Sequence, residues 1–475
     1  MWGREPMLQK CRPIHVSGAR TGTVNGGEKE GAQKCNSLRF GPFFVMDLDT
    51  QGTTSLTWQY TTDSILKYDV RFLSVCGLWP LQGSRLFRIF TVTIITLCLG
   101  HIAEAGINLC TLRGELEDYT LALSNVSVII VGVLKVAIFL RDEGSLCQLV
   151  RWLDALVKRQ TEYVRGQPCR EAIFREARQR ASRISKGLDA YNVSLLFVWI
   201  LAPLVASPGD KRLPLQQLPM ANTTAFPLYE LSYALQAISL TFIALINVHM
   251  DCFFTVVMIH IAAQLKIMAS RIADLHLTRN DGGNSSESKL GNNSLVMEDL
   301  YKQLCLCIHT HQDITRFIVH LEKVMNPIAM MQLALGVFNG CMLIFPAAYS
   351  AESGSLLKIL VSAPAVSTQL LLYCLGAHSV RQQGELVSLA AYSCGWPDAD
   401  ARFRKASLLI MARAQRALRL TAGGIYPIQR ATFLSVSLVS DQNQLQARMN
   451  LLRFMTQQHS WVKLLRPNIL PRIKS

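Results

Sequence analysis

The residue types that carry most enzyme chemistry form no recognisable catalytic or metal-binding pattern in this sequence. His309 and His311 are two positions apart, so a helix would turn their rings onto different faces. The chain contains neither a glycine-rich phosphate-binding loop nor a Gly-x-Ser-x-Gly motif. Its thirteen cysteines include no Cys-x-x-Cys pair and are typical of small buried side chains or free thiols. We therefore expect no catalytic residue, no metal site and no cofactor.

A few ionisable side chains interrupt otherwise apolar segments, where a charge in lipid is costly. His249 and Asp251 lie within one such segment, and His101 and Glu104 lie near the end of another. They could form a polar cavity, a proton relay or a gating pair. Interhelical hydrogen bonds that hold a bundle together are the commoner role, and we favour it. Lys135, near the inner end of its segment, is expected to extend its ammonium group to the lipid–water interface.

Long apolar stretches must position these side chains. Half of the 475 residues are hydrophobic, and the mean hydropathy is +0.23. Stretches of about 20 residues with few charges match the thickness of hydrocarbon, and they cover Leu86–Leu109, Leu121–Leu140, Leu188–Ala206, Tyr233–Ala263, Met325–Tyr349 and Leu356–Ala377. A weaker seventh stretch follows Gly424. Because lipid offers no hydrogen-bond partners and period-two alternation is absent, the expected fold class is all-α, a polytopic membrane protein with seven transmembrane helices.

The basic residues lie between these stretches and predict their orientation. Most of the Lys and Arg behind the formal charge of +15 follow the second, fourth and sixth stretches. The loop after the first stretch instead sets Arg113 against Glu115, Glu117 and Asp118. Since Lys and Arg in short loops stay in the cytoplasm, we expect a cytoplasmic N-terminus and an external C-terminus. The charge is thus interpreted as topology and not as nucleic-acid binding.

Two further features agree with this topology. Asn222 heads an Asn-Thr-Thr sequon in a loop expected outside, so it is a candidate glycosylation site. Residues 1–60 are polar and Gly-rich and contain no apolar signal segment, so the first spanning helix must target the chain. We expect this N-terminal extension to be disordered.

Apolar periodicity continues beyond several of the spans. Leu304, Ile308 and Leu321 follow helical spacing up to Met325, so the fifth span is expected to project as one long helix. A second stripe, from Leu146 to Val157, precedes the third span. Such extensions would form either a cytoplasmic helical bundle or helices lying on anionic lipid, and the sequence leaves both open.

The outer halves of the spans carry aromatic and polar side chains that would suit a small apolar-lined pocket. The candidate ligand-binding residues are Phe197, Trp199, Tyr233, Gln236, Phe242, Phe345 and Thr368. For any one of them, ordinary helix packing is the simpler interpretation, and only the set as a whole suggests a site.

The order and spacing of several short motifs resemble those of the insect odorant receptors. The motifs are Gly77-Leu78-Trp79-Pro80 before the first span, Asp251 with Ala263-Gln264-Leu265, Leu321-Glu322 with Gln332, Gly384-Glu385-Leu386, Ala391-Tyr392, Trp396, a basic helix over Arg413–Arg419, and Gly424 to Phe433. The similarity covers about Lys67 to Leu438.

This resemblance implies a ligand-gated, non-selective cation channel in the plasma membrane of sensory-neuron dendrites. The subunit would assemble with the odorant receptor co-receptor into a tetramer and bind a small volatile molecule in the outer half of the bundle. A half-helix from Ile425 to Val439 would line the pore through Thr432, Phe433, Val436 and Val439. The expected division is an extension over 1–60, a six-span bundle over 61–404, a cytoplasmic helix and pore span over 405–440, and an atypical tail over 441–475.

The C-terminal part departs from the family pattern. After Leu438 the chain turns polar and then basic, and Ile425–Val439 would extend only ~22 Å as a helix. Since hydrocarbon is about 30 Å thick, an altered 3′ exon that leaves the pore helix incomplete is one hypothesis. The nearest alternative family is the gustatory receptors, whose Thr-Tyr and Gln-Phe ending is missing here. A G-protein-coupled receptor would have the opposite orientation, and a transporter would show repeats or broken spans in both halves.

Overall fold

The described part of the structure, a computed structural model, is all-α apart from one small hairpin, which confirms the expected fold class. It describes residues 58–78, 85–111, 116–206, 213–214, 227–275, 288–344 and 353–433. The helices are α1 (Trp58–Asp63), α2 (Lys67–Val75), α3 (Arg85–Thr111), α4 (Leu116–Arg141), α5 (Glu143–Val164), α6 (Pro168–Ala206), α7 (Leu228–Ala273), α8 (Ser288–Ile344), α9 (Ser353–Ser393) and α10 (Ala401–Ala414), with a 3₁₀ turn, η3, over Trp396–Asp398.

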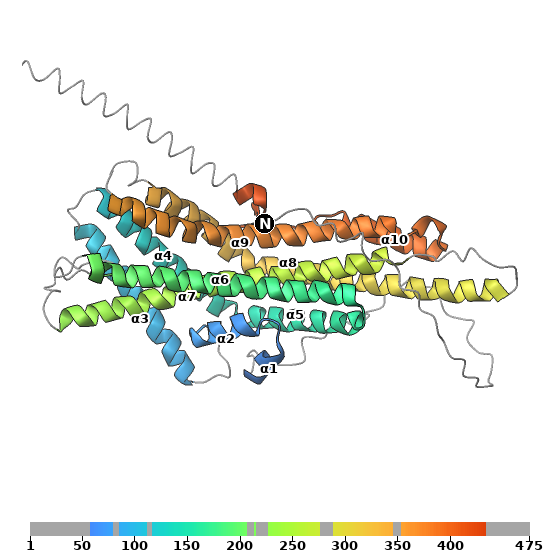
Figure 1. The fold of residues 1–475 in the computed structure, drawn as a ribbon, viewed down its shortest axis with the longest axis horizontal. Coiled ribbons are helices and arrows are strands. Elements are labelled where there is room, and N and C mark those ends of the chain that lie inside the picture. The colour runs from blue at the N-terminus through green and yellow to red at the C-terminus, as the bar shows by residue number, and fades with distance from the viewer. Residues whose placement is uncertain are drawn as a thin grey trace, which may run out of the picture. The chain divides into compact units, whose positions relative to one another are not determined.

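Helices α3, α4, α6, α7, α8 and α9 contain the six expected spans, the fifth as far as Ile344, and several continue well beyond them (Figure 1). Helices α6, α7, α8 and α9 have 39, 46, 57 and 41 residues. At about 1.5 Å per residue, each is about two to three times as long as hydrocarbon is thick. The expectation that the fifth span belongs to one long helix is confirmed by α8.

Four helices in the described part of the chain are long and apolar enough to cross a membrane. Their apolar windows are Ile89–Ile107, Ala122–Arg141, Pro168–Leu201 and Leu228–Ala273. On α3 and α6 the large apolar side chains at Ile89, Val92 and Phe197 point outward and are exposed. Outward-facing apolar rows of this kind require an apolar surrounding, so the chain is a membrane protein.

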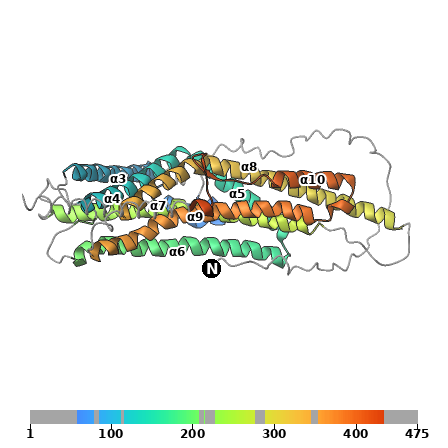
Figure 2. The same ribbon diagram turned by 90° about the horizontal axis from the view of Figure 1, so that it is seen from above.

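Helix α7 is the centre of the bundle. It packs against α9, α6, α4, α8, α3 and α2, and its side chains are buried on every side over Met250–Leu265. Figure 2 shows α6, α7 and α9 running side by side along much of their length. Because a helix that is apolar all round has to be covered on all faces, its composition explains this central position.

Beyond the apolar halves, the long helices form a second packed region. The apolar stripe of α5 is buried against α8 and α7, and the Trp152 ring meets the Phe317 ring edge-on at 5.8 Å. Of the two alternatives for this stripe, the structure therefore supports a helical bundle.

The expectation of a basic helix over Arg413–Arg419 is wrong. Helix α10 ends at Ala414, and the chain then runs against α9, where Leu418 is buried, into strands β1 (Thr421–Ala422) and β2 (Tyr426–Pro427). Thr421 pairs with Pro427 in an antiparallel register. The turn contains Gly423 and Gly424 at positive φ (64° and 71°), a conformation that favours glycine and ends any helix.

Several expectations fall on residues that the structure does not describe. Residues 1–57, Asn222, Phe345, the tail over 441–475, and Val436 and Val439 of the expected pore helix lie outside the described residues. Within the expected N-terminal extension, Trp58–Tyr60 already belongs to α1. Residues 430–433 of the expected seventh span are helical, and the rest of that span lies outside the described residues.

Candidate functional site

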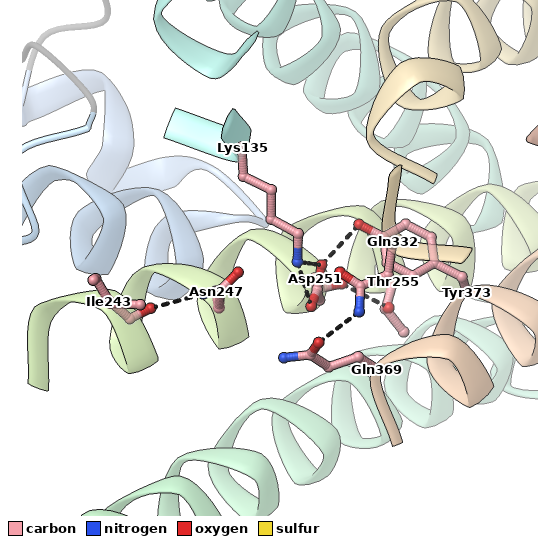
Figure 3. A network of polar contacts seen from close by, with 8 residues as sticks. All are labelled: Lys135, Ile243, Asn247, Asp251, Thr255, Gln332, Gln369 and Tyr373. Carbon is pink, nitrogen blue, oxygen red and sulfur yellow. Dashed lines mark hydrogen bonds and ion pairs between the residues drawn. The ribbon is translucent and has the colours of Figure 1, made fainter. Parts of the chain in front are cut away.

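A buried ion pair links three helices in the middle of the bundle (Figure 3). The Lys135 Nζ of α4 lies 2.8 Å and 3.0 Å from the two carboxylate oxygens of Asp251 on α7. The Tyr373 hydroxyl of α9 donates to Asp251 Oδ1 at 2.9 Å. All three residues are at most 1 % exposed. The expectation that Lys135 reaches the lipid interface is wrong, because Asp251 compensates its charge inside the bundle.

The pair is an interhelical link of the kind favoured for Asp251. Its two charges cancel, so the bundle contains a dipolar group and no net charge at this point. Each charge loses its hydration in the apolar interior, and the partner charge replaces it, together with the Tyr373 hydroxyl at Asp251. The arrangement therefore ties α4, α7 and α9 together as long as both charges are present.

A cavity of about 180 Å³ lies next to this pair, between α4, α6, α7, α8 and α9. Asp251 forms part of its wall. Most of the lining is apolar and includes Val128, Ile129, Leu195, Leu240, Leu335 and Leu372. Since an engineered apolar cavity of about 150 Å³ accommodates benzene, this space is large enough for a small organic molecule.

Five carboxamide side chains interrupt the apolar wall, and they are those of Asn192, Asn247, Gln332, Asn339 and Gln369. Asn339 accepts hydrogen bonds from the hydroxyls of Ser124, at 3.2 Å, and Ser127, which joins α8 to α4. Gln332 Nε2 donates to Gln369 Oε1 at 2.6 Å, which joins α8 to α9. The cavity thus has an apolar body with polar groups at a few fixed points, the usual composition of a small-molecule site.

The predicted ligand-binding residues are distributed between this cavity and other surroundings. Trp199 and Thr368 line the cavity. Phe197, two residues before Trp199, is 61 % exposed on the outer face of α6. Tyr233 donates from its hydroxyl to the backbone carbonyl of Ile200.

Two other predicted residues take part in contacts away from the cavity lining. Gln236 Nε2 donates to Glu104 Oε1 at 3.0 Å, and the Phe242 ring meets the Phe90 ring edge-on at 5.8 Å. These contacts join α7 to α3. The ligand-binding role of the whole set stays a prediction.

His249 and Asp251 are close in sequence but face different neighbours. The His249 ring stacks on Phe72 of α2, with 3.4 Å between ring centroids, and its Nε2 lies 3.1 Å from Asp189 Oδ1 of α6. Two residues advance a helix by roughly 200°, which explains the separation.

In the expected pore segment, Thr432 Oγ1 donates to the Pro427 carbonyl at 2.6 Å, and Phe433 packs against the core.

Outside the spans, α2 carries a buried acid. Asp69 is 3 % exposed and accepts a hydrogen bond from Ser185 Oγ at 3.3 Å. Burial raises the pKa of the Asp69 carboxyl to about 7. The charge of Asp69 therefore changes near neutral pH.

Sequence reasoning missed the partners of Asp251 and the polar points of the cavity. Lys135 and Tyr373 are 116 and 122 residues from Asp251 in the chain, so nothing local links them. One signal was present, since Lys135 and Asp251 are opposite charges in two different apolar stretches and each requires compensation. Within the described ranges, no group of three or more His, Cys, Asp or Glu side chains is arranged to hold a metal ion.

Comparison with known proteins agrees with this architecture. Residues 115–439, well over half of the chain, match the family model described as 7tm Odorant receptor. The chain belongs to the insect odorant receptor family. It is 24 % identical to odorant receptor 22c of Drosophila melanogaster over 376 residues, which cover 72 % of this chain and 86 % of that protein. The family is one of membrane receptors that serve olfaction, which agrees with the lack of an enzyme motif in the sequence.

Two solved structures share the fold. The olfactory receptor OR5 of Machilis hrabei is similar with a TM-score of 0.67 and 19 % identity, covering 80 % of this chain and 97 % of that one. The same receptor in complex with eugenol is similar with a TM-score of 0.68 and 18 % identity, covering 83 % of this chain and 99 % of that one. The multi-span helical fold expected from the sequence is thereby confirmed.

Proposed function

We propose that this odorant receptor is the ligand-binding subunit of a ligand-gated, non-selective cation channel that works together with the odorant receptor co-receptor. A small volatile molecule binds in the cavity between α4, α6, α7, α8 and α9. The single observation that carries this proposal is the cavity itself, which is lined by residues of five helices and is mostly apolar. The eugenol complex of the similar Machilis receptor supports ligand binding on this fold.

Helix α9 connects the cavity to the proposed pore segment through its side-chain contacts. Thr368, Gln369 and Leu372 of α9 line the cavity. Three turns further along the same helix, Arg381 Nη1 donates to Gln429 Oε1 at 2.7 Å, just before the helical residues 430–433. A ligand that shifts α9 relative to α7 and α8 would thus move the start of the segment in which Thr432, Phe433, Val436 and Val439 line the pore.

The proposed setting follows from the charge distribution and the family. The N-terminus lies in the cytoplasm, the cavity lies in the outer half of the bundle, and the chain resides in the plasma membrane of olfactory-neuron dendrites. Asn222 is then external and able to carry a glycan.

The test is the whole-cell current in cells that express this chain with the co-receptor, during application of a broad panel of volatiles. The expected result is a ligand-evoked cation current that is absent from cells with the co-receptor alone. No current from any volatile, despite surface expression and a responsive co-receptor, would contradict the proposed channel function.

A further inference from the structure

Helix α6 has one face that no other described helix covers, and this face changes character along its length. Toward the C-terminal end of the helix the exposed side chains are apolar, and they are Val193, Phe197, Leu201 and Leu204. Toward the N-terminal end they are basic, and they are Arg175, Arg178, Arg183 and Lys186. Figure 2 shows α6 along one side of the bundle, where α7 is its main neighbour.

The basic and the apolar side chains lie on the same side of the helix. Arg175, Lys186 and Phe197 follow one another at intervals of 11 residues, which make about three turns of α-helix. Arg183 is 14 residues, or about four turns, before Phe197. A lipid that covers the apolar side chains therefore meets the basic ones directly along the same face.

The change from apolar to basic side chains marks an edge of the hydrocarbon layer. Lys186 and Leu204 are 18 residues apart, about 27 Å along the helix, and hydrocarbon is ~30 Å thick. Side chains on a helix tilt toward its N-terminus, so the charged groups of Lys186 and Arg183 point away from the apolar part, at the depth of lipid head groups. With the cytoplasmic N-terminus proposed above, these head groups belong to the cytoplasmic leaflet, which contains anionic lipids.

The four basic side chains have no carboxylate partner among the described residues, because the nearby acids of α6 are engaged elsewhere. Glu176 pairs with Arg180 at 2.9 Å, and Glu171 accepts a backbone N–H at 2.9 Å. Asp189 accepts from the Tyr68 hydroxyl. The face therefore offers its positive charge to an anion from outside the chain.

We propose that this face of α6 binds a phosphoinositide, a lipid whose inositol head group carries several phosphates. Its acyl chains pack along Val193 and Phe197, and its phosphates contact Arg183 and Lys186. Clusters of Lys and Arg on the cytoplasmic side of a span favour such lipids, and a guanidinium can bind a phosphate through two parallel hydrogen bonds.

The two remaining arginines distinguish this lipid from one with a small head group. Arg178 and Arg175 lie about 12 Å and 16 Å from Lys186 along the helix. Only a head group that extends into the water approaches them. The site is also separate from the odorant cavity, because Leu195 and Trp199, which line the cavity, point to the opposite side of α6. The inference therefore goes beyond the proposed function.

The experiment measures the binding of soluble short-chain lipids to the purified full-length chain in detergent by microscale thermophoresis. The probes are dioctanoyl phosphatidylinositol bisphosphate, phosphatidylserine and phosphatidylcholine with the same acyl chains, and inositol trisphosphate as the head group alone. The phosphoinositide is expected to bind at least about tenfold more tightly than phosphatidylcholine, since each Lys or Arg near the head group contributes about fivefold. Inositol trisphosphate is expected to bind more weakly than the phosphoinositide, because it makes no contact with the apolar side chains.

A pair of charge-neutralising variants tests the assigned residues. Arg183→Gln/Lys186→Gln is expected to weaken phosphoinositide binding by about 25-fold, with the thermal midpoint unchanged because both side chains are exposed. Lys302→Gln/Arg316→Gln is the matched control, since it removes the same charge from α8 at side chains that are 69 % and 61 % exposed. The control is expected to bind with wild-type affinity.

A further variant tests how far the head group extends. Arg175→Gln/Arg178→Gln is expected to weaken phosphoinositide binding by about fivefold and to leave phosphatidylserine binding unchanged. Unchanged binding of both lipids in this variant would refute the assignment of a phosphoinositide.

Several other outcomes would overturn the inference. These are equal affinity for the phosphoinositide and phosphatidylcholine, wild-type affinity in Arg183→Gln/Lys186→Gln, or an equal loss in the α8 control. Inositol trisphosphate that binds as tightly as the lipid would identify a soluble polyphosphate as the ligand. Because binding is measured without the co-receptor and without current, its failure leaves the channel proposal intact, and a missing current leaves the lipid site intact.

Discussion

The Lys135–Asp251 pair makes a strong prediction about stability, because its members differ in what their removal leaves behind. Lys135→Met deletes the ammonium group and keeps a side chain of similar length. Asp251, 1 % exposed, then retains one described side-chain partner, the Tyr373 hydroxyl. Breaking a buried pair from one side costs about 3–5 kcal/mol. Asp251→Asn is expected to cost a similar amount, since Lys135 is left buried without a counter-charge.

The double variant Lys135→Met/Asp251→Asn separates loss of charge balance from loss of packing. It contains no buried charge at this point, and its Asn side chain can still accept from the Tyr373 hydroxyl. We expect it to be more stable than either single variant, with a coupling free energy of up to about 3 kcal/mol in the double-mutant cycle.

The assay is the thermal midpoint of each detergent-solubilised variant, followed by size-exclusion chromatography of a fluorescent fusion. Arg141→Met is the matched control, because its guanidinium is 66 % exposed and pairs with the adjacent Asp142. Its midpoint is expected to stay at the wild-type value. The reasoning would be refuted if the two single changes were additive in the double variant, or if Lys135→Met were as stable as the wild type.

Three further predictions concern other parts of the fold. Burial raises the pKa of Asp69 from its ordinary 3.8 to about 7 in the folded state, so wild-type stability is expected to fall by up to about 4 kcal/mol as the pH rises from about 4 through 7. Asp69→Asn should flatten this pH dependence in thermal midpoints measured at several pH values. An unchanged slope in the variant would contradict the prediction. Gly423→Ala should destabilise the hairpin more than Gly424→Ala, because both have positive φ but only at Gly423 would a Cβ lie 2.9 Å from Met330 Sδ; equal midpoints would argue against that contact. Phe317→Ala should lower stability by about 3–5 kcal/mol, since the fully buried Phe317 packs edge-on against Trp152. Val319 lies on the same helix but is 62 % exposed, so Val319→Ala should leave the thermal midpoint unchanged. A similar loss of stability in both variants would contradict the α5–α8 packing.

The helices were predictable because apolar length and periodicity are local properties of the chain. The spacing from Leu304 to Met325 predicts the long helix α8. The apolar spacing from Leu146 to Val157 predicts the buried face of α5. The segment over Arg413–Arg419 was wrongly predicted as a helix, since its conformation depends on burial of Leu418 against α9 and on the Gly423–Gly424 turn. Both are consequences of tertiary packing.

The cavity was only partly predictable, and Phe197 and Trp199 show why. Residues that are two positions apart on a helix point to nearly opposite faces, so only one of these two side chains can face the cavity. In a membrane protein the lipid-facing side is as apolar as the core, and composition therefore does not reveal which face is which. For the same reason, the carboxamide of Asn192 gave no sign in the sequence that it lies in a cavity wall.

The most direct test of the account is to fill the cavity and record the odorant response. Gly336 of α8 lines the cavity, and a Cβ at this position would meet no atom within 4 Å, so the side chain of Gly336→Phe is expected to occupy part of the cavity. Gly100→Phe is the control, because Gly100 also has open space around it but lies exposed on α3. With the co-receptor present and equal surface expression, we predict that Gly336→Phe abolishes the volatile-evoked current while Gly100→Phe retains it. An unchanged response in Gly336→Phe would contradict the assignment of this cavity as the odorant site.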